Sequence, residues 1–130
     1  MSNDSSLQII ETAYGRIEKH PDDIVCLYLT DNMQVDKPLA ELMVTQVRSL
    51  MQSDQIRLMI VYGVDCDIAF SAQRYFASVT GFTHVAFVVH TNAQAQVGQF
   101  LVSIFRSFKS MYEFRLFYET KTALAWLRQQ

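Results

Sequence analysis

The sequence predicts one α/β domain built on a mixed, mostly parallel sheet of five strands. Its 130 residues suit a single domain with a sizeable core, and half of them are hydrophobic. Short runs rich in β-branched and aromatic residues alternate with longer segments whose apolar residues recur every three or four positions. This alternation indicates strands joined by helical crossovers, which makes their pairing parallel and places helices against the sheet.

The chain begins with a predicted antiparallel hairpin. Residues 1–6 are polar and expected to be disordered, so the domain is taken as residues 7–130. Residues 7–18 are predicted to form the first strand, and the continuous apolar run at residues 24–30 the second. The link between them contains Pro21 followed by two aspartates, which is typical of a turn. Because this link is short, the two strands should pair antiparallel.

The rest of the chain is predicted to run α-β-α-β-α-β-α. The three remaining strands are residues 56–62, 85–89 and 114–118. The candidate helix caps are Asp36, Asp65 or Asp67, Asn92 and Thr120, and Gly81 is expected to end the second helix. The apolar stripes that should face the sheet include Leu42, Phe100, Phe105 and Trp126.

Composition and charge exclude several classes of protein. The net charge of -2 and pI near 5.8 argue against a nucleic-acid binder, which needs a basic surface to displace phosphate counterions. No apolar run is long enough for a transmembrane segment, and the N-terminal residues lack the features of a secretory signal. Cys26 and Cys66 lie far apart without a disulfide pattern. We therefore expect a cytoplasmic protein with reduced thiols and no cofactor.

Three apolar segments stand out in the last third of the chain: His84-Val85-Ala86-Phe87-Val88-Val89, Arg115-Leu116-Phe117 and Ala123-Leu124-Ala125-Trp126-Leu127. In these segments the chain resembles the STAS fold, in the branch of bacterial proteins called SpoIIAA-like or STAS/SEC14-like. The order of elements extends the likeness over about residues 7–128. These are mostly core residues, so the resemblance implies a fold more than an activity.

The phosphorylation switch of STAS regulators has no counterpart in this sequence. In the family, a hydroxyl in an Asp-Ser-Ser-Gly type loop between a strand and a helix is phosphorylated by a partner kinase. Here the loop is residues 63–68, where Asp65 stands near the acidic position and Cys66 and Asp67 near the hydroxyl position. Ser71 lies further along, on the predicted helix. Asp67 either supplies a fixed negative charge or caps the helix together with Asp65.

Catalytic and metal sites also lack support in the sequence. His84 and His90 bracket one predicted strand and are about 20 Å apart, too far to bind one metal ion. Two neighbouring carboxylates disfavour the thiolate of Cys66, which argues against a nucleophile. With four glycines, the chain has no glycine-rich phosphate loop. We expect a protein that is not an enzyme.

A ligand or partner site is expected at the carboxyl ends of the parallel strands, where open α/β sheets bind their ligands. Polar-tipped aromatic residues and a cation lie near those ends in the sequence. The candidate site residues are Tyr62, Asp65, Cys66, Asp67, Arg74, His90 and Asn92.

The third predicted helix and the segment after it carry more apolar residues than one side of a small sheet requires. Most of this stripe is expected to be core; the remainder suits a dimer patch, a cavity for a lipid-like ligand, or a membrane-contacting surface. We favour a homodimer through the candidate interface residues Val102, Phe105, Phe108, Met111 and Tyr112.

The sequence thus favours a non-catalytic regulatory or interaction module of the STAS type without the Ser/Thr switch. The alternative is a carrier or sensor of a small apolar, lipid-like ligand, associated with a membrane surface. The partner is accordingly expected to be a protein or an apolar small molecule, in addition to a second copy of the chain.

Overall fold

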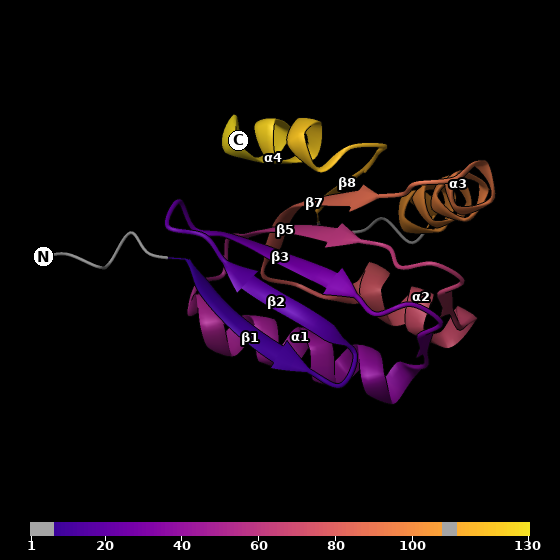
Figure 1. Ribbon diagram of the computed structural model, residues 1–130, viewed down its shortest axis with the longest axis horizontal. Coiled ribbons are helices and arrows are strands. Elements are labelled where there is room, and N and C mark those ends of the chain that lie inside the picture. The colour runs from indigo at the N-terminus through magenta and orange to yellow at the C-terminus, as the bar shows by residue number, and fades with distance from the viewer. Residues whose placement is uncertain (1–6, 108–111) are drawn as a thin grey trace, which may run out of the picture.

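The computed structural model describes residues 7–107 and 112–130 and confirms a mixed, mostly parallel α/β sheet in a single domain. The sheet has six strands in the order β1-β2-β3-β5-β7-β8 (Figure 1). The strands are β1 (Gln8–Thr12), β2 (Gly15–Lys19), β3 (Ile24–Leu29), β5 (Ile56–Val61), β7 (Phe82–Val88) and β8 (Glu113–Phe117). Strands β1, β2 and β3 pair antiparallel, whereas β3, β5, β7 and β8 pair parallel.

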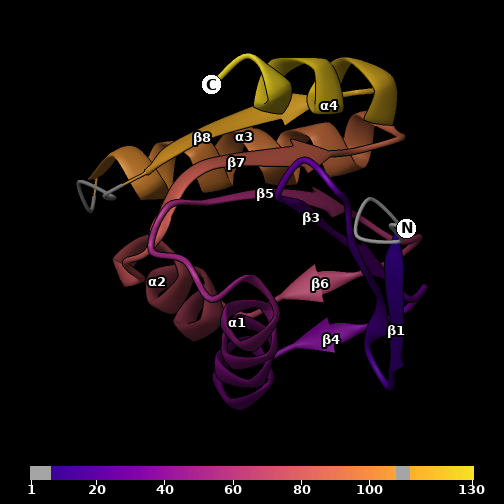
Figure 2. The same cartoon turned by 90° about the vertical axis from the view of Figure 1, so that its left-hand side faces the viewer.

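Helices cover the two faces of the sheet unequally. One core cluster joins the sheet to α1 (Lys37–Met51), α2 (Phe70–Ser78) and α3 (Asn92–Ser107). A second cluster, built from alternate residues of β3, β5 and β7, packs against α4 (Thr120–Arg128). Figure 2 shows α4 on the side of the sheet away from α1 and α2. Because each parallel strand lies beside its predecessor, three crossovers of the same hand place α1, α2 and α3 on one face.

The sheet has six strands rather than five because residues 7–18 do not form one strand. The chain turns back at residues 13–14, and β1 and β2 pair as a hairpin of their own. Gly15 adopts a φ of 148°, and a Cβ there would lie 2.0 Å from the carbonyl oxygen of Tyr28, so only glycine fits. A second, two-stranded sheet pairs β4 (Gln34–Val35) with β6 (Asp67–Ile68).

Only one of the predicted helix caps is confirmed by a side-chain hydrogen bond. The carboxylate of Asp36 accepts from the Leu39 amide at 2.9 Å at the start of α1. Neither α2 nor α4 has a side-chain cap, because Ala69 and Glu119 occupy the cap positions. At α3 it is Thr91, not Asn92, whose hydroxyl accepts from the Gln94 amide, at 3.1 Å. The predictions for Asp65, Asp67, Asn92 and Thr120 as caps were therefore wrong, and so was that for Gly81, because α2 already ends at Ser78 with Val79 as its C-cap.

The apolar stripes are rotated slightly from the predicted ones. Leu42 and Phe100 are exposed instead of facing the sheet, whereas Phe105 and Trp126 are buried as expected. In α3 the contact with β8 runs through Gly98, where a Cβ would lie 2.4 Å from a methyl carbon of Leu116. The helix therefore approaches the sheet along its small residues, and this turns Phe100 outward.

No helix in the described part of the chain is both long enough and apolar enough to cross a membrane.

Candidate functional site

The loops that follow β3 and β5 are tied together at the carboxyl end of the sheet. The amide of Asn32 donates to the carbonyl of Val64 at 2.7 Å, and the Val64 amide donates to the carboxylate of Asp31 at 2.8 Å. Gly63 makes this approach feasible, because a Cβ there would lie 2.6 Å from the carbonyl oxygen of Leu29. The loop from Gly63 to Ile68 is thus held against the loop after β3 by hydrogen bonds to the backbone of Val64.

Tyr62 supports this loop from inside. It is buried, its ring lies 5.1 Å from that of Phe87, and its hydroxyl donates to the carbonyl of Cys66 at 2.6 Å. Burial, together with the charges of Cys66 and Asp67, raises the pKa of Tyr62 to about 12. The hydroxyl therefore stays protonated at neutral pH and acts as a structural donor to the backbone.

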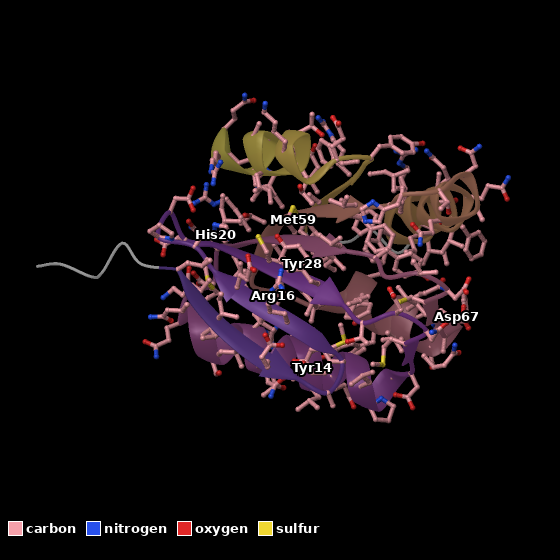
Figure 3. The ribbon with its side chains drawn as sticks, in the orientation of Figure 1. Tyr14, Arg16, His20, Tyr28, Met59 and Asp67 are labelled. Atoms are coloured by element: carbon pink, nitrogen blue, oxygen red, sulfur yellow. The ribbon has the colours of Figure 1, made fainter. Side chains whose placement is uncertain are left out.

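The other loop candidates do not converge on a pocket. Cys66 is half-buried and its thiol donates to the carbonyl of Thr30 at 3.1 Å. Asp65 is exposed with a φ of 56°, and Asp67 is exposed in β6, where its amide donates to the carbonyl of Met33. Figure 3 shows Asp67 at the rim of the molecule. The two carboxylates therefore face solvent rather than each other.

Gln94 is a residue that the sequence analysis missed. Its buried side chain accepts from the His90 amide at 2.7 Å and donates to the carbonyl of Gly63 at 3.0 Å. It therefore joins the carboxyl ends of β5 and β7 in one hydrogen-bonded bridge. His90 and Asn92, which were candidates, have exposed side chains. The sequence contained one sign of this role, because Gln94 is a polar residue at the start of the apolar stripe of α3.

Arg74 lies apart from the other candidate residues. It lines a surface hollow of about 440 Å³ between the beginning of α1 and α2, together with Lys37, Ser71, Tyr75 and Ser78. Its guanidinium carbon lies 5.9 Å from the centre of the Phe70 ring. None of the other predicted site residues lines this hollow.

The candidate interface residues also have different environments. Phe105 belongs to the core, Val102 is half-buried, and the hydroxyl of Tyr112 donates to the carbonyl of Phe76 at 2.6 Å. Phe108 and Met111 lie outside the described residues. Because Phe105 is buried within one chain, its side chain adds no surface to a dimer.

An apolar cavity of about 50 Å³ lies inside the core, on the face of the sheet that α1 and α2 cover. Leu27, Val44, Phe87, Leu101 and Phe105 are among its lining residues. A cavity of about 150 Å³ is the size known to admit benzene. The space here is about a third of that and suits nothing as large as an acyl chain.

Among residues 7–107 and 112–130, no group of three or more His, Cys, Asp or Glu side chains is placed to hold a metal ion. Neither cysteine forms a disulfide: Cys26 is buried in β3 and Cys66 lies in the loop after β5. Burial raises the pKa of Cys26 to about 12, which leaves no reactive thiolate near neutral pH.

Comparison with known proteins places the chain in a family. Residues 17–130 match a domain of unknown function, DUF7793. The comparisons with curated proteins and with solved structures found no match. The matched segment runs from within β2 to the last residue and so includes part of β2, the four strands β3, β5, β7 and β8, and the helices α1 to α4. The protein therefore belongs to the DUF7793 family.

Proposed function

We propose that this domain is a non-catalytic regulatory or interaction module of the STAS type that lacks a Ser/Thr phosphoswitch. The order of its elements supports the STAS assignment, since three antiparallel strands are followed by α-β-α-β-α-β-α along the main sheet. The loop between β5 and α2 supports the absence of a switch. No residue from Gly63 to Ile68 has a hydroxyl, and the loop is anchored to its neighbours by hydrogen bonds.

The observation that carries the interaction role is the unprotected edge of the main sheet. Strand β1 pairs with β2 on one side and with no described strand on the other (Figure 1). Leu7, Ile9 and Ile10 are 44%, 52% and 39% exposed along this edge. Monomeric proteins usually protect such an edge with charged side chains, Pro or a bulge; β1 has one charged residue, Glu11, and contains no Lys, Pro or bulge. An apolar edge strand of this kind is suited to pairing with another strand.

The partner that fits this edge best is a second copy of the chain. Two β1 strands related by a twofold axis would pair antiparallel, with the isoleucines at the centre of the new ladder. The only charged residue of the strand, Glu11, lies towards one end, so an antiparallel arrangement separates the two Glu11 carboxylates. The side chains of β2 and β3 next to this edge already pair with one another. Arg16 forms an ion pair with Glu18 at 2.8 Å, and its guanidinium carbon lies 4.6 Å from the centre of the Tyr28 ring (Figure 3). The proposed homodimer thus uses the edge of the sheet, not α3.

Sedimentation of two matched variants tests this proposal. Ile9→Lys and Phe100→Lys each replace an exposed apolar side chain by a cation, the first on β1 and the second on α3. We expect the wild type and Phe100→Lys to sediment as dimers, and Ile9→Lys as a monomer with an unchanged circular dichroism spectrum. A wild-type monomer at tens of micromolar, or dissociation caused by Phe100→Lys alone, would refute pairing through β1.

The alternative role, as a carrier or sensor of an apolar ligand, has weaker support. The internal cavity of about 50 Å³ is apolar, but a lipid-like ligand would require α1 and α2 to move away from the sheet. Native mass spectrometry of protein from its own host tests this role, because a retained lipid would add a discrete mass. The unpaired state of Cys26 and Cys66 suits the reducing cytoplasm, which is where we propose that the domain works.

A further inference from the structure

A polar hollow of about 460 Å³ lies at the amino ends of β5 and β7, at the opposite end of the strands from the predicted site. Its lining includes Asp23 from the turn before β3, Gln55 from the loop before β5, Arg57 from β5, and Thr83 and His84 from β7. Its volume is in the range of small-molecule sites. Three separate parts of the chain therefore bring polar side chains to one place.

An irregularity in the sheet directs two consecutive side chains to this hollow. In the pairing of β5 with β7, Ile56 lies opposite Phe82 and the next residue, Arg57, lies opposite His84. Thr83 therefore has no paired residue on β5. Consecutive residues of a regular strand face opposite sides of the sheet, whereas a bulge changes the direction of a side chain. Thr83 and His84 both line the hollow as a result.

Arg57 provides a fixed positive charge at the wall. Its guanidinium donates to the carbonyl of Leu127 at 3.0 Å and to the carbonyl of Asp22 at 2.6 Å. Within the described ranges no carboxylate pairs with it, and the carboxylate of Asp22 is paired with Arg128 at 2.7 Å. Asp23 also lines the hollow but forms no ion pair with Arg57. The cation is therefore held in position by two neutral carbonyl acceptors.

His84 lies beside Arg57 with hydrogen-bonding capacity to spare. The two residues face each other across the β5–β7 ladder. The imidazole stands edge-on to Trp126 with ring centres 5.5 Å apart, and Nδ1 is buried without a hydrogen-bond partner among the described residues. Buried polar atoms without partners are uncommon in folded proteins. This unpartnered atom belongs to a ring that lines the same hollow as Arg57.

We propose that this hollow binds a small oxyanion, a carboxylate or a phosphate, through Arg57 and His84. The guanidinium supplies the charge that an oxyanion requires, and the imidazole supplies a hydrogen bond beside it. The hydroxyl of Thr83, which lies 3.5 Å from the carbonyl oxygen of Ile56, lines the same wall. The site shares no residue with the β1 edge or with the loop after β5. It would therefore give the proposed interaction module a ligand-binding site of its own.

The three histidines of the chain make a direct test feasible by NMR, with His20 and His90 as internal controls in the same spectrum. Sodium phosphate and sodium succinate are titrated separately at constant pH and constant ionic strength, with sodium chloride as the reference salt. We expect the ring signal of His84, assigned by its loss in His84→Gln, to shift to a plateau with phosphate, succinate or both. A plateau with one probe alone shows whether the site prefers phosphate or carboxylate, and a plateau with both shows that it accepts either oxyanion. Parallel, non-saturating shifts of all three histidines, or no shift of His84 with either probe, would overturn the proposal.

Two variants then test the role of the charge. Arg57→Gln should weaken the saturating probe by about tenfold or more, since it removes a charge-assisted contact. Arg57 also anchors the end of α4 through the carbonyl of Leu127, so its loss could disturb the fold. Thr83→Val is therefore measured in parallel, because it leaves the contacts of Arg57 with the carbonyls of Leu127 and Asp22 in place. Lys37→Gln, in the separate hollow beside Arg74, is the matched control and should leave the affinity unchanged. An equal loss in Lys37→Gln and Arg57→Gln would show a general charge effect and contradict the assigned site.

Discussion

The indole of Trp126 packs against the imidazole of His84, with ring centres 5.5 Å apart and the planes at 78°. Phe117 lies at the same centre-to-centre distance, and the guanidinium of Arg115 stands 4.9 Å from the indole centre. Trp126 is only 9% exposed, and it is the largest residue by which α4 covers its face of the sheet. The C-terminal helix is therefore anchored by Trp126 together with the buried side chains of Ala123 and Leu127.

Trp126→Ala should destabilise the fold by about 3 to 5 kcal/mol, the usual cost of removing a large buried aromatic side chain. The free energy of unfolding is measured by urea denaturation. Leu42→Ala is the control, because Leu42 is exposed and its loss should change stability by about 0.5 kcal/mol or less. If Trp126→Ala unfolds at the same urea concentration as the wild type, α4 does not contribute to the core.

Tyr62→Phe should destabilise the protein by about 1 to 3 kcal/mol, because it leaves the carbonyl of Cys66 without its donor in a partly buried loop. The ring and its contact with Phe87 are retained, so the loss reports the hydroxyl alone. Tyr118→Phe removes a hydroxyl from an exposed side chain and should have no measurable effect. Equal denaturation curves for the two variants would show that the hydroxyl of Tyr62 does not stabilise the loop.

The fold was largely predictable because its signals are local. The runs at residues 56–62 and 85–89 consist of strand-forming apolar residues, and Asp36 followed by Pro38 marks a helix start; the structure has β5, β7 and α1 there. The turn at residues 13–14 was also marked, by Gly15 within the run, and was read wrongly as a continuous strand. Leu42 and Phe100 were misplaced because periodicity defines a stripe only to within about one residue.

The candidate site was far less predictable, because it depends on contacts between distant residues. Gln94 reaches Gly63 across 31 positions, and Arg57 reaches Leu127 across 70. The bulge that turns Thr83 towards the hollow has no glycine or other marker in the sequence. Proximity of strand ends could be inferred from the parallel order, but the direction of each side chain could not. Tyr62 and Cys66, both candidate site residues, lie close together because the hydroxyl of Tyr62 donates to the carbonyl of Cys66.

The loop from Gly63 to Ile68 should not be phosphorylated in cells, because it contains no hydroxyl. Phosphopeptide mapping of the protein from its own host measures this. Ser71 is exposed on α2 and is the nearest hydroxyl after the loop, so it is the residue to monitor. Phosphate at Ser71, accompanied by a change in partner binding that Ser71→Ala abolishes, would contradict a module without a switch.

The two cysteines should differ sharply in reactivity. Cys26 is fully buried in β3, and burial, reinforced by the charges of Glu18 and Asp22, raises its pKa from 9.0 to about 12. Cys66 is half-buried near the surface. At pH 8 a thiol reagent such as dithionitrobenzoate should label Cys66 in the folded protein and both cysteines in urea. Rapid labelling of Cys26 in folded Cys66→Ala would show that β3 opens in the native state.

The same shift predicts how stability changes at alkaline pH. Folding raises the pKa of Cys26, so the folded state disfavours the thiolate relative to the unfolded chain. The contribution of the neutral thiol is complete below pH 9 and is lost as the pH rises from 9 towards 12. Urea denaturation across this range should therefore show a smaller loss of stability in Cys26→Ala than in the wild type. Identical slopes for Cys26→Ala and the wild type would exclude Cys26 as the titrating group.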